Sequence, residues 1–217
     1  PWPHGMLAAL RAWCDEPGAH LILDEVMTGF GRTGKMFACQ HENVVPDFLC
    51  LAKGITGGYL PMAATLTTGK IYDAFLGAPG NAFYYGHSYT ANPLGCVAAL
   101  ASLDVFQQEQ TLENLAPKIE HLRAGLAALQ AAHPIVHEVR QCGFVAGIEL
   151  RQADGGKFPP ALRFGEKICQ TARPHGLLTR PILDPIVLMP PLCPTTAELD
   201  HALAALESAI SENAGID

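Results

Sequence analysis

The stretch that decides the fold begins with His20-Leu-Ile-Leu-Asp24, a short apolar run that ends in an acid. A glycine-rich loop follows from Thr28 to Gly34, and a second apolar run, from Asp47 to Leu51, stops just before Lys53. Apolar runs of this length, bounded by turn residues, are typical of buried strands. We therefore expect two strands, one ending at Asp24 and the other just before Lys53.

Outward from this stretch, helices and strands are expected to alternate. Met6, Leu10, Trp13 and Cys14 recur at helical spacing and predict an amphipathic helix before the first strand. The segment 61–68, rich in Thr and Ala, could form a third strand. Residues 92–106 are apolar nearly all round, as a buried helix would be. Alternating elements of this kind favour an α/β fold.

The composition shifts near Gln107, which predicts a domain boundary between 107 and 115 and assigns residues 1–110 and 111–217 to separate domains. A leucine-rich helix opens the second domain, and a helix docked on a sheet is favoured over a short coiled coil. Thr195 and Glu198 form a capping box for a final helix. Between these helices the pattern predicts strands at 135–140, 144–150, 177–180 and 186–189 and a helix at 161–172.

Composition excludes several classes of protein. The chain has 217 residues, of which 49% are hydrophobic and 16% charged, and its formal net charge is −7. That apolar content is too high for intrinsic disorder. No apolar stretch approaches the roughly 20 residues of a membrane span, so we expect no membrane. The acidic balance argues against a nucleic-acid partner bound through its phosphates.

The seven cysteines are odd in number and contain no C-x-x-C pair. They indicate neither a disulfide framework nor a zinc site, so we expect no metal and a reducing, cytoplasmic compartment. The chain has no apolar leader, no initiator methionine and an abrupt start on Pro-Trp-Pro. We interpret it as a fragment whose upstream part is missing.

Asp24 and Lys53 are the first candidates for chemistry. A carboxylate at the end of a buried strand either caps or pairs locally or is aimed at a cationic ligand atom, because α/β proteins bind ligands at the carboxyl edge of the sheet. Glu25, on the other face of the strand, is expected to be structural. A lysine directly after an apolar strand begins in partly desolvated surroundings, which favour the neutral amine that attacks carbonyls. A surface lysine in a turn is the alternative.

Two further candidates complete the set. Ser88 and Thr90 precede a helix start, where hydroxyls and free N–H groups can bind a phosphate or simply cap the helix. Arg180 could bind a carboxylate in bidentate geometry or be an ordinary surface residue. An acid for a pyridinium nitrogen, a lysine for a Schiff base and a hydroxyl for a phosphate together indicate pyridoxal phosphate chemistry.

Two long motifs, in the same order, resemble the class III pyridoxal-phosphate aminotransferases. They are Leu23-Asp-Glu-Val-Met-Thr-Gly-Phe-Gly-Arg-Thr-Gly34 and Ala52-Lys-Gly-Ile-Thr-Gly-Gly-Tyr-Leu-Pro61, with 29 positions from Asp24 to Lys53. The segments 34–43, 86–95 and 187–191 are most similar to the branch of that family that serves biotin biosynthesis. The resemblance covers nearly the whole chain but only about the second half of a family member.

The resemblance implies a fold and a set of roles. The fold is type I of the pyridoxal-phosphate-dependent transferases, with residues 1–110 as the C-terminal part of the large domain and 111–217 as the small α+β domain. Asp24 holds the pyridine nitrogen protonated, Val26 packs on the ring and Lys53 forms the Schiff base. Ser88 contacts the cofactor phosphate from the neighbouring subunit of a homodimer. Gly86 lies beside the substrate, and Arg180 takes the carboxylate of the oxo acid.

The implied reaction is a ping-pong transamination that converts 8-amino-7-oxononanoate to 7,8-diaminononanoate, with S-adenosylmethionine as the usual amino donor and lysine in some relatives. Three alternatives remain. Another class III enzyme could act on ornithine, 4-aminobutyrate or a semialdehyde. A truncated half could bind no cofactor and offer only a dimer surface. An α/β phosphate binder could lack Schiff-base chemistry altogether.

Overall fold

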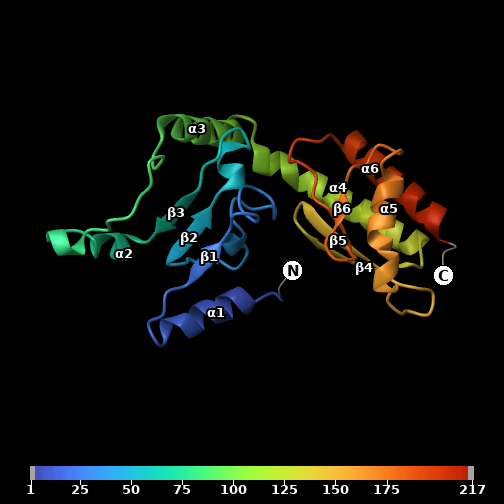
Figure 1. The fold of residues 1–217 in the computed structure, drawn as a ribbon, viewed down its shortest axis with the longest axis horizontal. Coiled ribbons are helices and arrows are strands. Elements are labelled where there is room, and N and C mark those ends of the chain that lie inside the picture. The colour runs from blue at the N-terminus through green and yellow to red at the C-terminus, as the bar shows by residue number, and fades with distance from the viewer. Residues whose placement is uncertain (1–2, 215–217) are drawn as a thin grey trace. The chain divides into compact units, whose positions relative to one another are not determined.

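The computed structural model describes residues 3–214, and the chain folds into two compact units that divide between Leu112 and Glu113 (Figure 1). Each unit has a sheet of its own, with three strands in the first and four in the second. Within the described residues, no helix is both long and apolar enough to cross a lipid bilayer.

The first unit is built on a mixed sheet of three short strands. These are β1 (Ile22–Asp24), β2 (Phe48–Leu51) and β3 (Ala64–Thr67), side by side in that order. β1 and β2 are parallel, with Asp24 opposite Cys50, and β3 runs antiparallel to β2. The three expected strands are confirmed, and the carboxyl ends of β1 and β2 meet at one edge of the sheet.

Helices and tight turns connect these strands. They are α1 (Met6–Asp15), α2 (Gly69–Asp73) and α3 (Pro93–Gln108), with 3-10 turns at Ala38–His41, Lys53–Thr56 and Pro79–Asn81. Phe30, Leu51, Ile55 and Ala99 form one buried cluster, so the glycine-rich loop, β2 and α3 share a core. A smaller cluster of Cys14, Leu21 and Val44 packs α1 against the start of β1.

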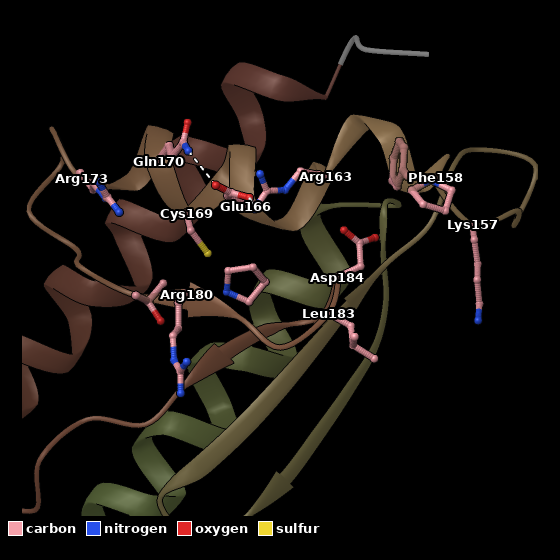
Figure 2. A pocket seen from close by; sticks show the side chains of 13 residues that line it. Lys157, Phe158, Arg163, Glu166, Cys169, Gln170, Arg173, Arg180, Leu183 and Asp184 are labelled. Atoms are coloured by element: carbon pink, nitrogen blue, oxygen red, sulfur yellow. Dashed lines mark hydrogen bonds and ion pairs between the residues drawn. The ribbon is translucent and has the colours of Figure 1, made fainter.

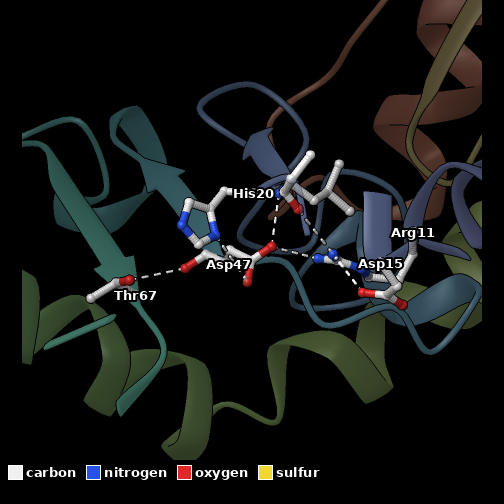
Figure 3. Close-up of polar contacts among 7 residues, drawn as sticks. Arg11, Asp15, His20, Asp47 and Thr67 are labelled. Carbon is white, nitrogen blue, oxygen red and sulfur yellow. Dashed lines mark hydrogen bonds and ion pairs between the residues drawn. The ribbon is translucent and has the colours of Figure 1, made fainter. Parts of the chain in front are cut away.

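A polar network ties the elements together at the amino ends of β1 and β2 (Figure 3). The Asp47 carboxylate accepts hydrogen bonds from Arg11 Nη1 at 2.6 Å and from the Leu21 amide at 2.8 Å. The Asp47 carbonyl accepts one from Thr67 Oγ1 at 3.0 Å, and Arg11 also pairs with Asp15 at 2.8 Å. Arg11 holds the pKa of Asp47 below its ordinary value, so this carboxylate stays charged and links α1 to all three strands.

Two burial expectations for this unit are wrong. The helix expected at 92–106 forms as α3, but only Gly95 and Ala99 of it are buried, while Leu94 is 73% exposed and Val97 63% exposed. β1 is not a buried strand either, because Ile22 is 60% exposed. β1 pairs with β2 on one side only within the described residues, and that leaves its outer edge uncovered.

The second unit is an antiparallel sheet with helices packed on it. Its strands are β4 (Val136–Cys142), β5 (Val145–Leu150), β6 (Arg180–Pro181) and β7 (Ile186–Leu188), in the order β4-β5-β7-β6. The helices are α4 (Thr111–Ala132), α5 (Phe164–Ala172) and α6 (Thr196–Asn213), with a 3-10 turn at Pro160–Leu162. Four expected strands are found, although residues 177–179 lie outside β6.

One continuous core holds the second unit together. The leucine-rich face of α4 packs into a buried cluster with β5, α5 and α6, which confirms a helix docked on a sheet. The fully buried side chains of this cluster include Phe144, Ile148 and Leu206. The capping box at the start of α6 also forms, since the Glu198 amide donates to Thr195 Oγ1 and the Thr195 amide donates to Glu198 Oε2.

Candidate functional site

Asp24 and Lys53 lie at the same edge of the first sheet. Asp24 is the last residue of β1, and Lys53 follows the last residue of the parallel strand β2 by two positions. The Glu25 amide donates to the Cys50 carbonyl at 2.9 Å, which continues the pairing of the two strands past Asp24. Parallel strands thus bring together an acid and an amine that are 29 residues apart in the chain.

Asp24 has an exposed carboxylate with a local hydrogen bond. Its Oδ1 accepts from the amide of Val26 at 2.9 Å, which fixes the turn that leaves the strand, and Val26 itself is half-buried. No ion pair involves Asp24 among residues 3–214. The local bond occupies one carboxylate oxygen, so the second oxygen is available to a cationic or N–H ligand atom at the sheet edge.

Lys53 starts the 3-10 turn and has a left-handed backbone, with φ of 46°. Its side chain is exposed, so the expectation that neighbouring apolar residues desolvate it is wrong for this chain. The next residue must be small, because a Cβ on Gly54 would lie 2.7 Å from the Cβ of Phe30. The glycine-rich loop therefore packs directly beneath the lysine turn.

Gly86 and Ser88 lie in a stretch, residues 82–91, that is exposed throughout. Within residues 3–214, no hydrogen bond or ion pair joins this stretch to Asp24 or Lys53. Helix α3 is capped by Asn92, whose Oδ1 accepts from the Gly95 amide at 2.7 Å. The Ser88 hydroxyl therefore does not serve as the helix cap and has no partner among the described residues.

Arg180 belongs to the second unit, where it lines a pocket of about 580 Å³ between β6, α5 and the segment before α5 (Figure 2). The acids of the pocket have local partners: Glu166 pairs with Arg163, and Asp184 Oδ1 accepts from the Gly165 amide at 2.9 Å. Arg180 is exposed and has no ion pair within the described residues. Its guanidinium is therefore available to an anion. Cys169 is buried in the same wall, and burial raises its pKa to about 11, so it is a neutral thiol there.

Glu25 is the residue whose surroundings sequence reasoning did not foresee. It is expected to be structural, and it is indeed buried, being only 3% exposed. Its carboxylate accepts hydrogen bonds from Thr28 Oγ1 and from the amides of Ala38 and Cys39. Two of these donors are backbone groups, which have no signature in the sequence; the only signal was a second acid directly beside Asp24.

No cluster of three or more His, Cys, Asp or Glu side chains suited to a metal ion occurs in the described part of the chain. The candidate groups are instead a carboxylate and an amine at one edge of the first sheet, an exposed hydroxyl on a separate stretch of the first unit and, in the second unit, a guanidinium that lines a pocket of its own. Asp24 and Lys53 lie at the same edge of the first sheet. Ser88 and Arg180 lie on other segments of the chain, and each has its own surroundings there.

Comparison with known proteins shows which family contains chains similar to this one. The model of the aminotransferase class-III family matches residues 1–210. The adenosylmethionine-8-amino-7-oxononanoate aminotransferase of Nitratidesulfovibrio vulgaris is 50% identical over 212 residues, which cover 96% of this chain and 39% of that protein. The chain spans about half the length, or less, of the curated relatives it matches.

Solved structures agree with the family match. The crystal structure of adenosylmethionine-8-amino-7-oxononanoate aminotransferase from Methanocaldococcus jannaschii superposes with a TM-score of 0.91 at 44% identity, covering 98% of this chain and 50% of that one. An omega-transaminase from Thermomicrobium roseum superposes with a TM-score of 0.89 at 36% identity, covering 97% and 47%. The fold is therefore that of part of a type I pyridoxal-phosphate-dependent transferase, and the chain belongs to the class III aminotransferase family.

Proposed function

We propose that the protein containing this chain uses pyridoxal phosphate to transfer an amino group to 8-amino-7-oxononanoate, giving 7,8-diaminononanoate in biotin biosynthesis, with S-adenosylmethionine as donor. The observation that carries this proposal is the placement of Asp24 and Lys53 at one carboxyl edge of parallel strands. The similarity to relatives that carry the name of that enzyme supports the choice of substrate.

The residues present fit the cofactor. A pyridinium N–H needs an anionic acceptor, and Asp24 has a carboxylate oxygen without a backbone partner. An aldehyde needs a primary amine, and Lys53 offers one at the same sheet edge. Val26 follows Asp24 and offers an aliphatic surface for one face of a flat ring. When bound, pyridoxal phosphate supplies an electron sink for a developing carbanion.

The chain's own groups then have distinct tasks. Asp24 would accept a hydrogen bond from the ring nitrogen of the cofactor, and its negative charge would favour the protonated ring. Lys53 would hold the cofactor through its primary amine and, when that amine is free, would serve as the base that moves a proton at the donor carbon. Arg180 binds the far carboxylate of the oxo acid through its planar guanidinium.

We also propose a homodimer with shared active sites. The stretch 82–91 supports this, because Tyr84 is 82% exposed and Tyr85 77% exposed, and large aromatic side chains of this kind favour protein interfaces. Gly86 would then lie beside the substrate, and the Ser88 hydroxyl would donate a hydrogen bond to the cofactor phosphate of the neighbouring subunit. A second copy of the chain would cover the exposed aromatics.

Two further assignments belong to the same proposal. Residues 1–110 correspond to the C-terminal part of the large, cofactor-binding domain, and residues 111–217 to the small C-terminal domain. A reducing cytoplasm is proposed as the location, because all seven cysteines are free thiols. A class III transaminase of other amines is the second candidate, since a solved omega-transaminase shares the fold over nearly the whole chain.

The first test is borohydride reduction of the purified protein in the presence of pyridoxal phosphate, followed by peptide mass mapping. A phosphopyridoxyl mass on the Lys53 peptide is expected. A panel of oxo acids and amino donors then separates the two candidates, with 8-amino-7-oxononanoate as the preferred acceptor. Absence of label on Lys53, or equal rates with 4-aminobutyrate or ornithine, would contradict the proposal.

A further inference from the structure

Glu25 is the one acidic or basic side chain among residues 3–214 that is fully buried. Its Oε2 accepts from the Ala38 amide at 2.6 Å and from Thr28 Oγ1 at 3.0 Å, and its Oε1 accepts from the Cys39 amide at 2.8 Å. All three partners are donors, and no cation pairs with the carboxylate in the described part of the chain. Three N–H or O–H donors thus satisfy both oxygens of the buried side chain.

The Glu25 carboxylate lies at the start of the 3-10 turn Ala38–His41, whose first two amides it binds. Cys39 contributes no competing charge, because burial and the neighbouring Glu25 raise the pKa of its thiol to about 11. The contact joins the end of β1 to a segment more than ten residues further along the chain. Glu25 therefore joins the two ends of the segment from Val26 to Phe37, which contains the glycine-rich loop.

The backbone of Glu25 reinforces this closure. Its amide donates to the Cys50 carbonyl on β2, and its carbonyl accepts from the Gly29 amide, both at 2.9 Å. Gly29 must stay small, since a Cβ there would lie 2.8 Å from that carbonyl oxygen. One residue thus bonds to the neighbouring strand, to the start of the loop and to its far end.

The closed loop reaches the lysine turn through Phe30. Phe30 is buried, its amide donates to the Met36 carbonyl at 2.6 Å, and its ring packs where a side chain on Gly54 would stand. Gly54 is covalently next to Lys53. A continuous chain of contacts therefore runs from Glu25, beside Asp24, through the loop to the residue beside the amine.

We propose that Glu25 is a positioning residue. Its buried carboxylate holds the glycine-rich loop in one conformation, and the loop in turn holds Asp24 and Lys53 at the separation at which both can contact the same cofactor ring. The inference rests on the proposed function, because it assumes that a cofactor spans these two groups. Glu25 is buried and both of its carboxylate oxygens are bonded within the chain, so the proposed effect does not require contact with the ring. Its effect is transmitted through Val26 on one side and through Phe30 and Gly54 on the other.

The test compares Glu25→Gln with Glu42→Gln in the protein expressed from its own gene. Glu42 is a matched control, because its carboxylate also accepts two backbone amides at a helix start, from Gly5 at 3.0 Å and Ala8 at 2.8 Å. The measurements are the melting temperature without cofactor, the Kd of pyridoxal phosphate, and the pH dependence of the visible absorption of the bound cofactor. Both variants should melt earlier than the wild type.

Only Glu25→Gln should weaken binding of pyridoxal phosphate, by about tenfold, and shift the pH midpoint of its absorption. A lowered melting temperature with an unchanged Kd and an unchanged absorption midpoint would make Glu25 merely structural and overturn the inference. If Glu25→Gln does not fold, Thr28→Val removes one of the three donors, and an unchanged Kd in that variant has the same meaning. Failure of the wild type to take up cofactor at Lys53 would instead overturn the proposed function.

Discussion

Replacement of Arg180 by alanine is expected to raise the KM for the oxo acid and to leave kcat nearly unchanged. An ion pair in open water contributes at most about 1 kcal/mol, which corresponds to roughly a fivefold change. A charge-assisted contact in an enclosed site contributes about 1.5–3 kcal/mol, or roughly 10- to 140-fold. Arg180 lines a pocket and has no competing ion pair in the described residues, so the larger range is expected once substrate covers it.

The assay is steady-state formation of 7,8-diaminononanoate at varied oxo-acid concentration and saturating donor, in the protein expressed from its own gene. Arg173→Ala is the matched control, since Arg173 lines the same pocket from the end of α5. An anchor for a remote carboxylate acts equally in the ground and transition states, so its loss appears in KM. A KM within twofold of the wild type, or an equal rise in Arg173→Ala, would refute the assignment of Arg180.

Three further predictions use other parts of the chain. Lys53→Ala should abolish turnover and borohydride labelling, while Lys70→Ala, an exposed lysine on α2, should retain both; residual turnover in Lys53→Ala would remove it from the chemistry. Gly165→Ala should lower the free energy of unfolding by about 1–3 kcal/mol in urea titrations, because the new Cβ would lie 1.9 Å from the Asp184 carbonyl oxygen. Gly147→Ala is the control, because the space around its Cβ is open, and equal losses in the two variants would contradict the predicted clash. The pKa of Asp47 is lowered in the folded state, so its stabilisation is present above the unfolded pKa of about 3.9 and is lost as pH falls through the folded value. Asp47→Asn should therefore flatten the fall of melting temperature below about pH 4, and parallel curves for the two proteins would refute this.

Local signals predicted the elements of this chain well. The leucine spacing of α4 and the capping box of α6 depend on neighbours within a few turns of the same helix, and both are found as expected. Local sequence also singles out the acid and the lysine as candidates, since Asp24 ends one short apolar run and Lys53 comes just after another. The sheet then brings them to one edge, because β1 and β2 pair in parallel.

Burial was predicted less well, for a physical reason. Apolar residues such as Leu94 and Val97 show that a helix face favours contact with something apolar, but their pattern does not say which surface provides it. The expected desolvation of Lys53 was wrong on the same ground, since an apolar strand before a lysine does not enclose the lysine itself. The role of the Glu25 carboxylate depends on backbone amides at Ala38 and Cys39, which any residue type would supply.

The backbone of Lys53 has a consequence for how position 53 can vary. A φ of 46° is unfavourable for a lysine and costs about 1–3 kcal/mol, whereas glycine or asparagine adopts it readily. Conformational preference alone would thus replace this lysine, and a glycine there would make the chain without cofactor more stable. Under the proposed function, position 53 therefore trades stability for chemistry, because the reaction requires an amine that glycine and asparagine cannot supply.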